Sequence, residues 1–260
     1  MKRLNKKVAL ITGAAQGLGA VYAKAMANEG ARVVLSNILD CQPIVESIIE
    51  NGGDAISQVC DVTDNTALNN LVKTSESEYG PIEILVNNAA LFTDLRRKGF
   101  EKIKEDEWDK VMLVNVRGTF QATKAVVPSM RRCGRGKIIN ISSGTILGGV
   151  SHFLHYVTSK GAIMAMTRSL SRELGDDNIC VNTIAPGLTE SEGLYNHPDY
   201  SDVREWNRSL RVFQRDMLPE DLIGALLFFI PIINLFAAPL VAILVLHTLN
   251  TKGYNGPISD

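Results

Sequence analysis

Short apolar runs rich in β-branched residues alternate along the chain with longer segments of helical pattern. The candidate strands are KVALITG, ARVVLSN, AISQVCDV, IEILVNNAA, GKIINISS and ICVNTIAPG. Most of them are apolar throughout instead of alternating, as expected for a parallel sheet that helices cover on both faces. The intervening segments are long enough for crossover helices, which we expect at residues 18–29, 66–79, 107–132 and 156–174.

This strand–helix order predicts the α/β class, with a single doubly wound parallel sheet and helices on both of its faces. No internal repeat or low-complexity linker divides the chain, so residues 1–260 are expected to form one domain. The start MKRLNKKVALITGAAQG imitates a secretory signal, but its apolar part is short and continues into Thr-Gly. A first strand is therefore the better interpretation.

Charge and cysteine content narrow the functional classes. The 27 basic and 28 acidic residues leave the chain nearly neutral, which argues against nucleic acid and against an anionic membrane surface as partners. The four cysteines are scattered, without the paired spacing of zinc sites or redox motifs, so we expect no metal site. Reduced, buried thiols in a cytoplasmic protein are the simplest interpretation.

The segment ITGAAQGLGA follows the first expected strand and opens a helix. Gly13, Gly17 and Gly19 allow a tight turn without Cβ atoms, so that backbone N–H groups and a helix N-terminus can face a pyrophosphate. With Gln16 and Leu18, this loop is a candidate dinucleotide site, although glycines also serve ordinary strand-to-helix turns.

The second expected strand ends in LSNILD. In dinucleotide-binding folds an acidic residue here holds the adenosine ribose, whereas a nearby arginine accommodates a 2′-phosphate. Asn37 is neither, and no basic residue stands beside it or in the glycine loop. NAD is therefore favoured over NADP, with a plain turn role as the alternative for Asn37.

The segment HYVTSKGA puts Tyr156 and Lys160 on one face of an expected helix. A phenol titrates near ~10 in water, and a fixed ammonium beside it stabilises the phenolate, so that the pair can exchange a proton with an alcohol or carbonyl oxygen. An ordinary exposed helix pair is the alternative. Ser142 and Ser143 end the fifth strand as a substrate-binding hydroxyl or as turn residues. Asn115 is either a helix irregularity or a placed polar group.

Taken together, these segments resemble the short-chain dehydrogenase/reductase family, which has a Rossmann-like sheet. The glycine loop, NNAA, NISS, YVTSK and VNTIAPG occur in the family's order and at its usual spacing. The resemblance implies that Tyr156 is the catalytic acid/base and that Lys160 lowers its pKa while binding the nicotinamide ribose. It also implies that Ser143 polarises the substrate oxygen, and that Asn115 holds a water in a proton relay to Lys160. The family's usual serine-to-tyrosine spacing selects Ser143 over Ser142.

The resemblance also implies the cofactor contacts, with Asp61 and Val62 against the adenine, Asn88 and Ala89 beside the ribose, and residues 186–189 near the nicotinamide. The expected cofactor-binding set is Gly13, Gln16, Gly17, Leu18, Gly19, Asn37, Asp61, Val62, Asn88, Ala89, Tyr156, Lys160, Pro186, Gly187 and Thr189. Family members usually form homotetramers or homodimers. This chain departs from the family at Asn37, where NAD-using members commonly have Asp, and at Ala90, where Gly is usual.

Beyond a cofactor and catalytic core at residues 1–190, we expect residues 191–218 to form a substrate lid. An apolar or aromatic pocket is indicated by Leu194, Tyr195, Tyr200 and Trp206 together with Phe92, Phe153 and Leu188, unless these side chains only pin the lid to the core. The sequences LHYVTSKGA and APGLTESEG resemble those of family members that oxidise secondary or ring-borne alcohols. The expected function is hydride transfer between NAD(H) and a small secondary alcohol or ketone, by an enzyme that acts on CH–OH groups.

The family resemblance ends after Ile230. A last helix is expected at residues 219–229, with Glu220 and Asp221 suited to its N-terminus. An atypical apolar tail follows at residues 230–260, where the family would have a strand with Thr-Gly-Gln and Asp-Gly-Gly stretches.

Three interpretations of this tail stay open. A divergent buried strand with a subunit contact and a shift of the reading frame are both favoured over a membrane segment, because Pro231 and Pro239 interrupt the apolar run. The matching alternatives for function are a catalytically impaired dinucleotide-binding protein and a membrane-associated reductase of a lipid, steroid or 3-oxoacyl substrate.

Overall fold

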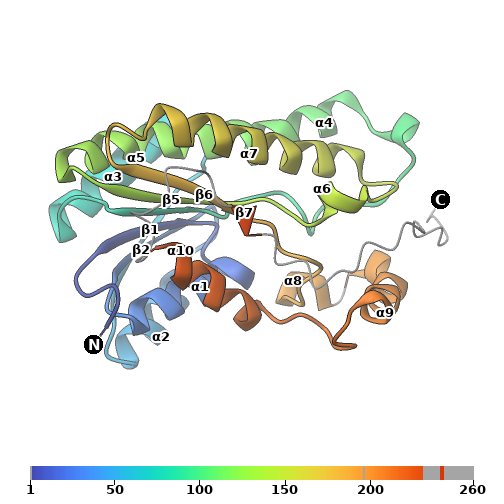
Figure 1. Ribbon diagram of the computed structural model, residues 1–260, viewed down its shortest axis with the longest axis horizontal. Coiled ribbons are helices and arrows are strands. Elements are labelled where there is room, and N and C mark those ends of the chain that lie inside the picture. Colours follow the sequence, from blue (N-terminus) through green and yellow to red (C-terminus); the bar gives the residue numbers. More distant parts are fainter. Residues whose placement is uncertain (1, 196, 231–240, 243–260) are drawn as a thin grey trace.

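A parallel sheet with the strand order β3-β2-β1-β4-β5-β6-β7 forms the centre of the molecule (Figure 1). The computed structural model describes residues 2–195, 197–230 and 241–242. The strands are β1 (Val8–Thr12), β2 (Arg32–Asn37), β3 (Asp54–Val59), β4 (Ile84–Asn87), β5 (Gly136–Ile141), β6 (Ile179–Ile184) and β7 (Val241–Ala242). The order reverses between β1 and β4, and ligands of doubly wound sheets bind at such a point.

Helices cover both faces of the sheet (Figure 1). One layer contains α1 (Gly17–Asn28), α2 (Gln42–Glu50) and α10 (Ile223–Phe229). The opposite layer contains α3 (Asn65–Tyr79), α4 (Glu105–Met112), α5 (Thr119–Cys133) and α7 (Leu154–Glu173). The remaining elements are η1 (Phe100–Lys102), the π-helical η2 (Leu113–Gly118), α6 (Thr145–Gly148), α8 (Glu192–Tyr195), η3 (Pro198–Tyr200), α9 (Ser201–Leu210) and η4 (Pro219–Leu222).

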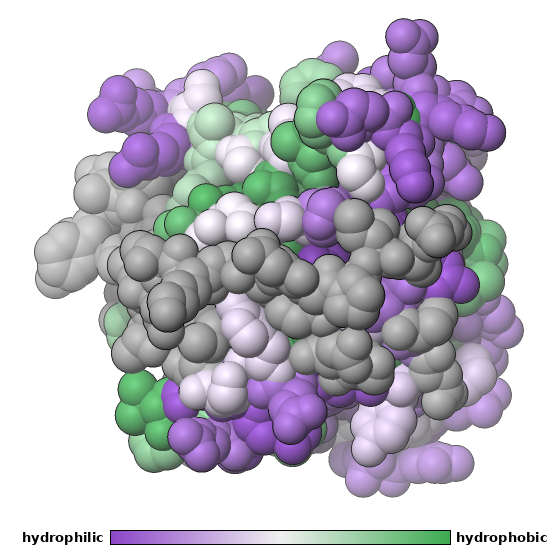
Figure 2. Space-filling view, turned by 90° about the vertical axis from the view of Figure 1, so that its right-hand side faces the viewer, coloured by the Kyte–Doolittle hydropathy of each residue, from purple (hydrophilic) through white to green (hydrophobic). Residues whose placement is uncertain are grey.

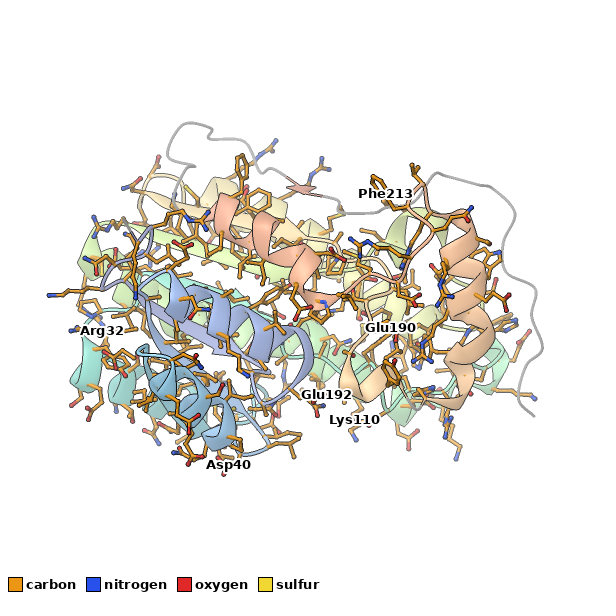
Figure 3. The ribbon with its side chains drawn as sticks, turned by 90° about the horizontal axis from the view of Figure 1, so that it is seen from below. Arg32, Asp40, Lys110, Glu190, Glu192 and Phe213 are labelled. Carbon is orange, nitrogen blue, oxygen red and sulfur yellow. The ribbon has the colours of Figure 1, made fainter. Side chains whose placement is uncertain are left out.

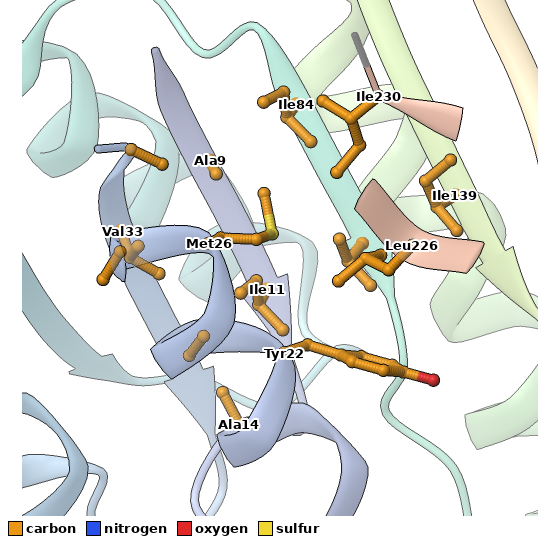
Figure 4. Close-up of a cluster of buried hydrophobic side chains, with 14 of the residues drawn as sticks. Ala9, Ile11, Ala14, Tyr22, Met26, Val33, Ile84, Ile139, Leu226 and Ile230 are labelled. Atoms are coloured by element: carbon orange, nitrogen blue, oxygen red, sulfur yellow. The ribbon is translucent and has the colours of Figure 1, made fainter. Parts of the chain in front are cut away.

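The central strands are apolar because both of their faces are covered. Every residue of β1 and of β4 is buried. Figure 4 shows the cluster on one face, where Tyr22 and Met26 of α1 lie over the sheet near Ile11, and Leu226 of α10 lies close by. Removing such side chains from water is the main stabilising contribution of a core, at about 25 cal/mol per Å² of apolar surface.

The predicted architecture is confirmed: the strands and the α/β sheet lie where the apolar runs indicated. The helix expected at residues 107–132 is present as a continuous helical stretch, in which α4 is followed directly by the π-helical η2 and by α5. Its apolar pattern continues across the junction, so periodicity alone did not reveal the extra residue per turn that a π-helical segment introduces. The helix at Gln42–Glu50, with Pro43 in its first turn, was not anticipated.

The expected last helix is present as η4 followed by α10, and Asp221 accepts a hydrogen bond from the Leu218 backbone N–H (2.9 Å). Beyond Ile230, Val241 and Ala242 alone are described, and they pair in parallel with Thr183 and Ile184 of β6. The other residues of the tail, and with them its three interpretations, lie outside the described residues. Within the described parts of the chain, no helix combines the length and the apolar character needed to cross a bilayer.

The end of the molecule that carries residues 191–218, the expected lid, has a surface of mixed polarity. In Figure 2, hydrophilic side chains gather along the upper and lower margins of this face, with apolar side chains beside them in its upper half. In Figure 3, Glu190 lies between α8 and α9, and Phe213 lies past the end of α9. Phe213 is exposed. Residues 191–218, the expected lid, contain the helical elements α8, η3 and α9.

Candidate active site

The four expected catalytic residues come from three neighbouring elements. Tyr156 and Lys160 lie one turn apart on α7, Ser143 follows the carboxyl end of β5, and Asn115 lies in η2. All four side chains are buried. Elements far apart in the sequence thus deliver these polar groups to one place at the carboxyl edge of the sheet, as the resemblance implied.

Lys160 is a buried cation held by the backbone of the adjacent strand. Its Nζ donates to the carbonyl oxygen of Ile141 (2.8 Å) and lies 5.7 Å from the centre of the Tyr156 ring. Burial lowers the pKa of Lys160 to about 8, because taking an ammonium out of water disfavours its charged form.

Tyr156 is a buried phenol whose proton is held firmly. Burial raises the pKa of Tyr156 above its usual value, and a hydrogen bond with Ser143 opposes that rise without cancelling it. The lowering of this pKa by Lys160, which the resemblance implies, stays a prediction. The ammonium is directed at the Ile141 carbonyl, so desolvation dominates the phenol.

The two serines after β5 have different partners. Ser142 Oγ donates to the carbonyl oxygen of Lys160 (2.8 Å) and so fastens α7 to the strand. Ser143 Oγ accepts from the backbone N–H (3.3 Å) and the hydroxyl (3.0 Å) of Thr145, and it also hydrogen-bonds Tyr156. This arrangement supports the choice of Ser143 as the substrate-binding hydroxyl.

Asn115 is both a helix irregularity and a placed polar group. Its Oδ1 accepts from the Leu91 backbone N–H (2.7 Å), while its Nδ2 donates to the Leu91 carbonyl (3.2 Å) and to Ser159 Oγ (3.0 Å). The side chain therefore joins η2, the segment after β4 and α7. The proton relay from Asn115 to Lys160 stays a prediction.

The glycine loop is shaped by close backbone approaches. Gly13 has φ +67°, and a Cβ there would lie 2.7 Å from Ala89 Cα. A Cβ on Gly19 would lie 2.2 Å from the Gly13 carbonyl oxygen. Gln16 precedes α1 without a side-chain cap, which leaves the first backbone N–H groups of α1 for another acceptor. This cradle fits a pyrophosphate.

Asn88 ties the segment after β4 to this loop. Its Nδ2 donates to the carbonyl oxygens of Thr12 (3.1 Å) and Gly13 (2.9 Å). Ala90 is exposed and lacks a positive φ, so its backbone does not require the glycine that the family usually has there.

The residues expected around the adenosine follow β2 and β3. Asn37 Oδ1 accepts from the Leu39 backbone N–H (3.0 Å), which gives Asn37 the turn role considered above. Asp61 accepts from the Thr63 backbone N–H (2.8 Å), and Val62 is buried so close to η2 that a Cβ on Gly118 would lie 2.6 Å from its Cγ2.

Residues 186–189 lie between β6 and the lid. The Pro186 carbonyl accepts from the Gly144 backbone N–H (2.7 Å), and Thr189 Oγ1 donates to the Gly187 carbonyl (3.0 Å). Arg211, which the sequence did not single out, is buried and donates to the carbonyls of Leu188 (2.6 Å) and Arg215 (2.8 Å). No sequence pattern marks a contact between residues so far apart.

Aromatic rings surround Tyr156. The Phe153 ring is stacked on the Tyr156 ring with centres 4.8 Å apart, and the Phe92 ring lies 5.1 Å from Tyr156 and 5.7 Å from Tyr200. Leu194 is buried with Tyr200, which both the pocket interpretation and the alternative of a lid pinned to the core expect. Tyr195 is 70% exposed, so its inclusion in that pocket is wrong. Its ring contacts the Arg204 guanidinium instead (5.4 Å).

Comparisons with known proteins agree with this geometry. The family model of the short chain dehydrogenases matches residues 7–199. The chain is 34% identical over 230 residues to a 3-oxoacyl-[acyl-carrier-protein] reductase of Thermotoga maritima, which covers 87% of this chain and 91% of the relative. It is 40% identical over 191 residues to galactitol 2-dehydrogenase of Agrobacterium fabrum, and this alignment covers 73% of each chain.

Among solved structures, levodione reductase has the same fold, with a TM-score of 0.84 at 24% identity over 93% of this chain and 96% of that chain. The matched model spans the glycine loop, the segment after β4 and the Tyr156–Lys160 pair. The chain therefore belongs to the short-chain dehydrogenase/reductase family of oxidoreductases, which use nicotinamide dinucleotide cofactors.

Proposed function

We propose that this protein interconverts a secondary alcohol and a ketone by hydride transfer with NAD(H). The observation that carries the proposal is the convergence of Tyr156, Ser143 and Lys160 at the carboxyl edge of the sheet, next to a glycine cradle that fits a pyrophosphate. The nicotinamide, when bound, supplies or takes up the hydride.

The residues of the chain supply proton transfer and orientation. In the reductive direction Tyr156 gives its proton to the carbonyl oxygen as hydride reaches the carbonyl carbon, and Ser143 polarises that oxygen by donating a hydrogen bond. The raised pKa of Tyr156 keeps the phenol protonated at neutral pH, which suits reduction. Lys160 binds the nicotinamide ribose, and Asn115 takes part in the relay that returns a proton to Tyr156.

NAD is the proposed cofactor in preference to NADP. The segment from Ser36 to Pro43 contains Asp40 and no Lys or Arg, so a 2′-phosphate would meet no cation of that segment. The proposed adenosine and ribose contacts are those of Asn37, Asp61, Val62, Asn88 and Ala89, with Gly13, Gln16, Gly17, Leu18 and Gly19 at the pyrophosphate. Pro186, Gly187 and Thr189 are proposed to contact the nicotinamide.

An apolar, ring-bearing substrate is proposed from the groups around the phenol. Phe92 joins two buried clusters, one containing Phe153 and Tyr156 and the other containing Leu194 and Tyr200. Aromatic and aliphatic side chains of this kind favour a ring or hydrocarbon over a polyol chain. We further propose a cytoplasmic homotetramer or homodimer. The free thiols of Cys41, Cys60, Cys133 and Cys180 support a reducing compartment.

Turnover of cyclic secondary alcohols with NAD, and separately with NADP, tests this function. The expected result is NADH formation from cyclic secondary alcohols such as cyclohexanol, with a much lower rate of NADPH formation from NADP. Tyr156→Phe is expected to abolish turnover while NADH binding, followed by fluorescence, stays within about twofold of the unaltered protein. A variant that retains turnover would refute the assigned acid/base, and tight cofactor binding without any turnover would favour the impaired dinucleotide-binding protein.

Reduction of a 3-oxoacyl thioester is the second candidate. It is favoured by the Thermotoga maritima relative, which aligns with more of this chain than the galactitol dehydrogenase does. An acetoacetyl thioester assayed beside a cyclic ketone distinguishes the two, because the aromatic surroundings of Phe92 predict the higher kcat/KM for the ketone.

A further inference from the structure

The residue directly before the proposed acid/base is a histidine in a dry site. His155 is 0% exposed, and its Nε2 lies 3.0 Å from Oε1 of Glu107 on α4. The other carboxylate oxygen of Glu107 accepts from Lys98 Nζ (2.6 Å). Burial alone would raise the pKa of Glu107, but the hydrogen bonds from Lys98 and His155 outweigh it and lower that pKa. Glu107 is therefore an ionised acceptor, and His155 Nε2 is the donor.

Packing alone does not require a histidine at this position. The Nδ1 atom of His155 is buried and has no hydrogen-bond partner among the described residues. A leucine or phenylalanine would fill similar space without leaving a ring nitrogen unpaired, which is unfavourable in a buried site. The feature that a histidine adds here is the directed bond from α7 to Glu107.

This bond is connected to Tyr156 by ring contacts. The Phe153 ring lies edge-on to the His155 ring with centres 5.8 Å apart, and it stacks on the Tyr156 ring at 4.8 Å. A rotation of His155 would therefore move Phe153 and change the packing of the phenol.

The same network fixes the loop that carries Phe92. The backbone N–H of Lys98 donates to the His152 carbonyl (2.9 Å) in the turn before α7, while its side chain binds Glu107. The loop is thus held to the start of α7 by its backbone and to α4 by its side chain. His155 completes the connection by joining α4 to α7.

We propose that Glu107 and His155 are positioning residues, which hold the first turn of α7 and the Phe92 loop so that the Tyr156 hydroxyl meets the substrate oxygen. The proposal rests on the function proposed above. Neither residue touches the reacting atoms, and the pair acts through Phe153, Lys98 and the backbone of α7.

Variants of His155 separate positioning from mere packing. His155→Leu fills the volume but cannot donate, and His155→Gln keeps a side-chain N–H for Glu107. We expect His155→Leu to lower kcat by about tenfold to a hundredfold, the range that a small misplacement of a reacting group produces, with substrate KM and NADH affinity nearly unchanged. His155→Gln should recover most of the lost kcat. Glu105→Gln, which alters an exposed carboxylate on α4 two residues before Glu107, is the matched control and should behave as the unaltered protein.

A second readout does not depend on turnover. For each protein, the near-ultraviolet circular dichroism of Tyr156 is obtained by subtracting the spectrum of the same protein with Tyr156→Phe added. His155→Leu should lose this contribution, and His155→Gln and Glu105→Gln should keep it. An intact signal in His155→Leu, or a folded His155→Gln with kcat as low as that of His155→Leu, would overturn the proposal. Absence of turnover in the unaltered protein would overturn the proposed function instead, and the spectra would still decide whether the pair positions Tyr156.

Discussion

The glycine loop and the lid both border the carboxyl edge of the sheet, yet different atoms hold them in place. At Gly13 and Gly19 the backbone approaches its neighbours so closely that a Cβ would lie 2.7 Å or 2.2 Å from another backbone atom. In the lid, side chains make the contacts, including Arg204 with Glu190 and Arg211 with two carbonyls. The close backbone approaches of the glycine loop accept glycine alone. The contacts of the lid could be made by other side chains. We infer that cofactor binding is the constrained part of this protein and that substrate choice is its adjustable part.

The largest effect is expected when one methyl group is added to the glycine loop. Gly19→Ala should weaken NADH binding by about tenfold to a hundredfold, because overpacking against backbone costs about 1–3 kcal/mol and the loop must shift. Fluorescence titration with NADH measures the change. Gly224→Ala, where a Cβ meets nothing within 4 Å, is the control and should bind NADH normally. Normal NADH binding by Gly19→Ala would refute the assignment of the glycine loop as the pyrophosphate site.

The pH dependence of turnover sharpens the account of the buried pair. Because the raised pKa of Tyr156 keeps it protonated, the oxidative rate should climb by about tenfold per pH unit through neutrality, since oxidation needs the phenolate. The reductive rate should stay level and then fall as the pH rises through about 8, where Lys160 loses its proton and its charge. Initial rates in both directions between pH 6 and about 10 test this, and an oxidative rate independent of pH would contradict it.

Substrate preference should change with the ring that joins the two apolar clusters. Phe92→Ala is expected to raise kcat/KM for a two-ring alcohol relative to cyclohexanol by about tenfold, because a hydrophobic pocket discriminates size by this order. The ratio of the two specificity constants is the readout. Phe100→Ala removes an exposed ring and should leave the ratio unchanged. If Phe92→Ala had the same ratio as the unaltered protein, the substrate would not bind beside Phe92.

The smallest effects are expected at the arginines of the lid, and they should follow burial. Arg211→Met removes two hydrogen bonds to carbonyls and should raise substrate KM several-fold, with Arg211→Lys a poor substitute because one ammonium lacks the fork geometry. Arg208→Gln breaks an exposed ion pair with Asp216 and should change neither KM nor Tm measurably. An equal rise of substrate KM in Arg208→Gln and in Arg211→Met would contradict the expectation that the effect follows burial.

The parts of the site that the sequence predicted are those with a local pattern. The glycine loop shows in the spacing of Gly13, Gly17 and Gly19, and the Tyr156–Lys160 pair shows in one helical turn. The Glu107–His155 bond and the Arg211–Leu188 contact join residues far apart in the sequence, so nothing local indicates them. Nor does the sequence reveal that burial would raise the pKa of Tyr156, because desolvation depends on the whole surrounding structure.

The fold was predictable for a similar reason. Central parallel strands are buried on both faces, so β1 and β4 are almost wholly apolar runs that stand out from the helices, and β5 keeps three isoleucines in its buried part. The π-helical character of η2 was missed because helical periodicity tolerates one extra residue, although Asn115 marked the place as irregular. The short α9 was hidden in a segment of mixed polarity.

In the proposed reaction, hydride moves between the carbinol carbon of an alcohol and the nicotinamide. We would measure it by incubating the protein with NAD and cyclohexanol carrying deuterium on its carbinol carbon, and weighing the NADH by mass spectrometry. The account predicts NADH that carries the deuterium, and no NADH with Tyr156→Phe. NADH without deuterium, or deuterated NADH from Tyr156→Phe at the unaltered rate, would contradict it.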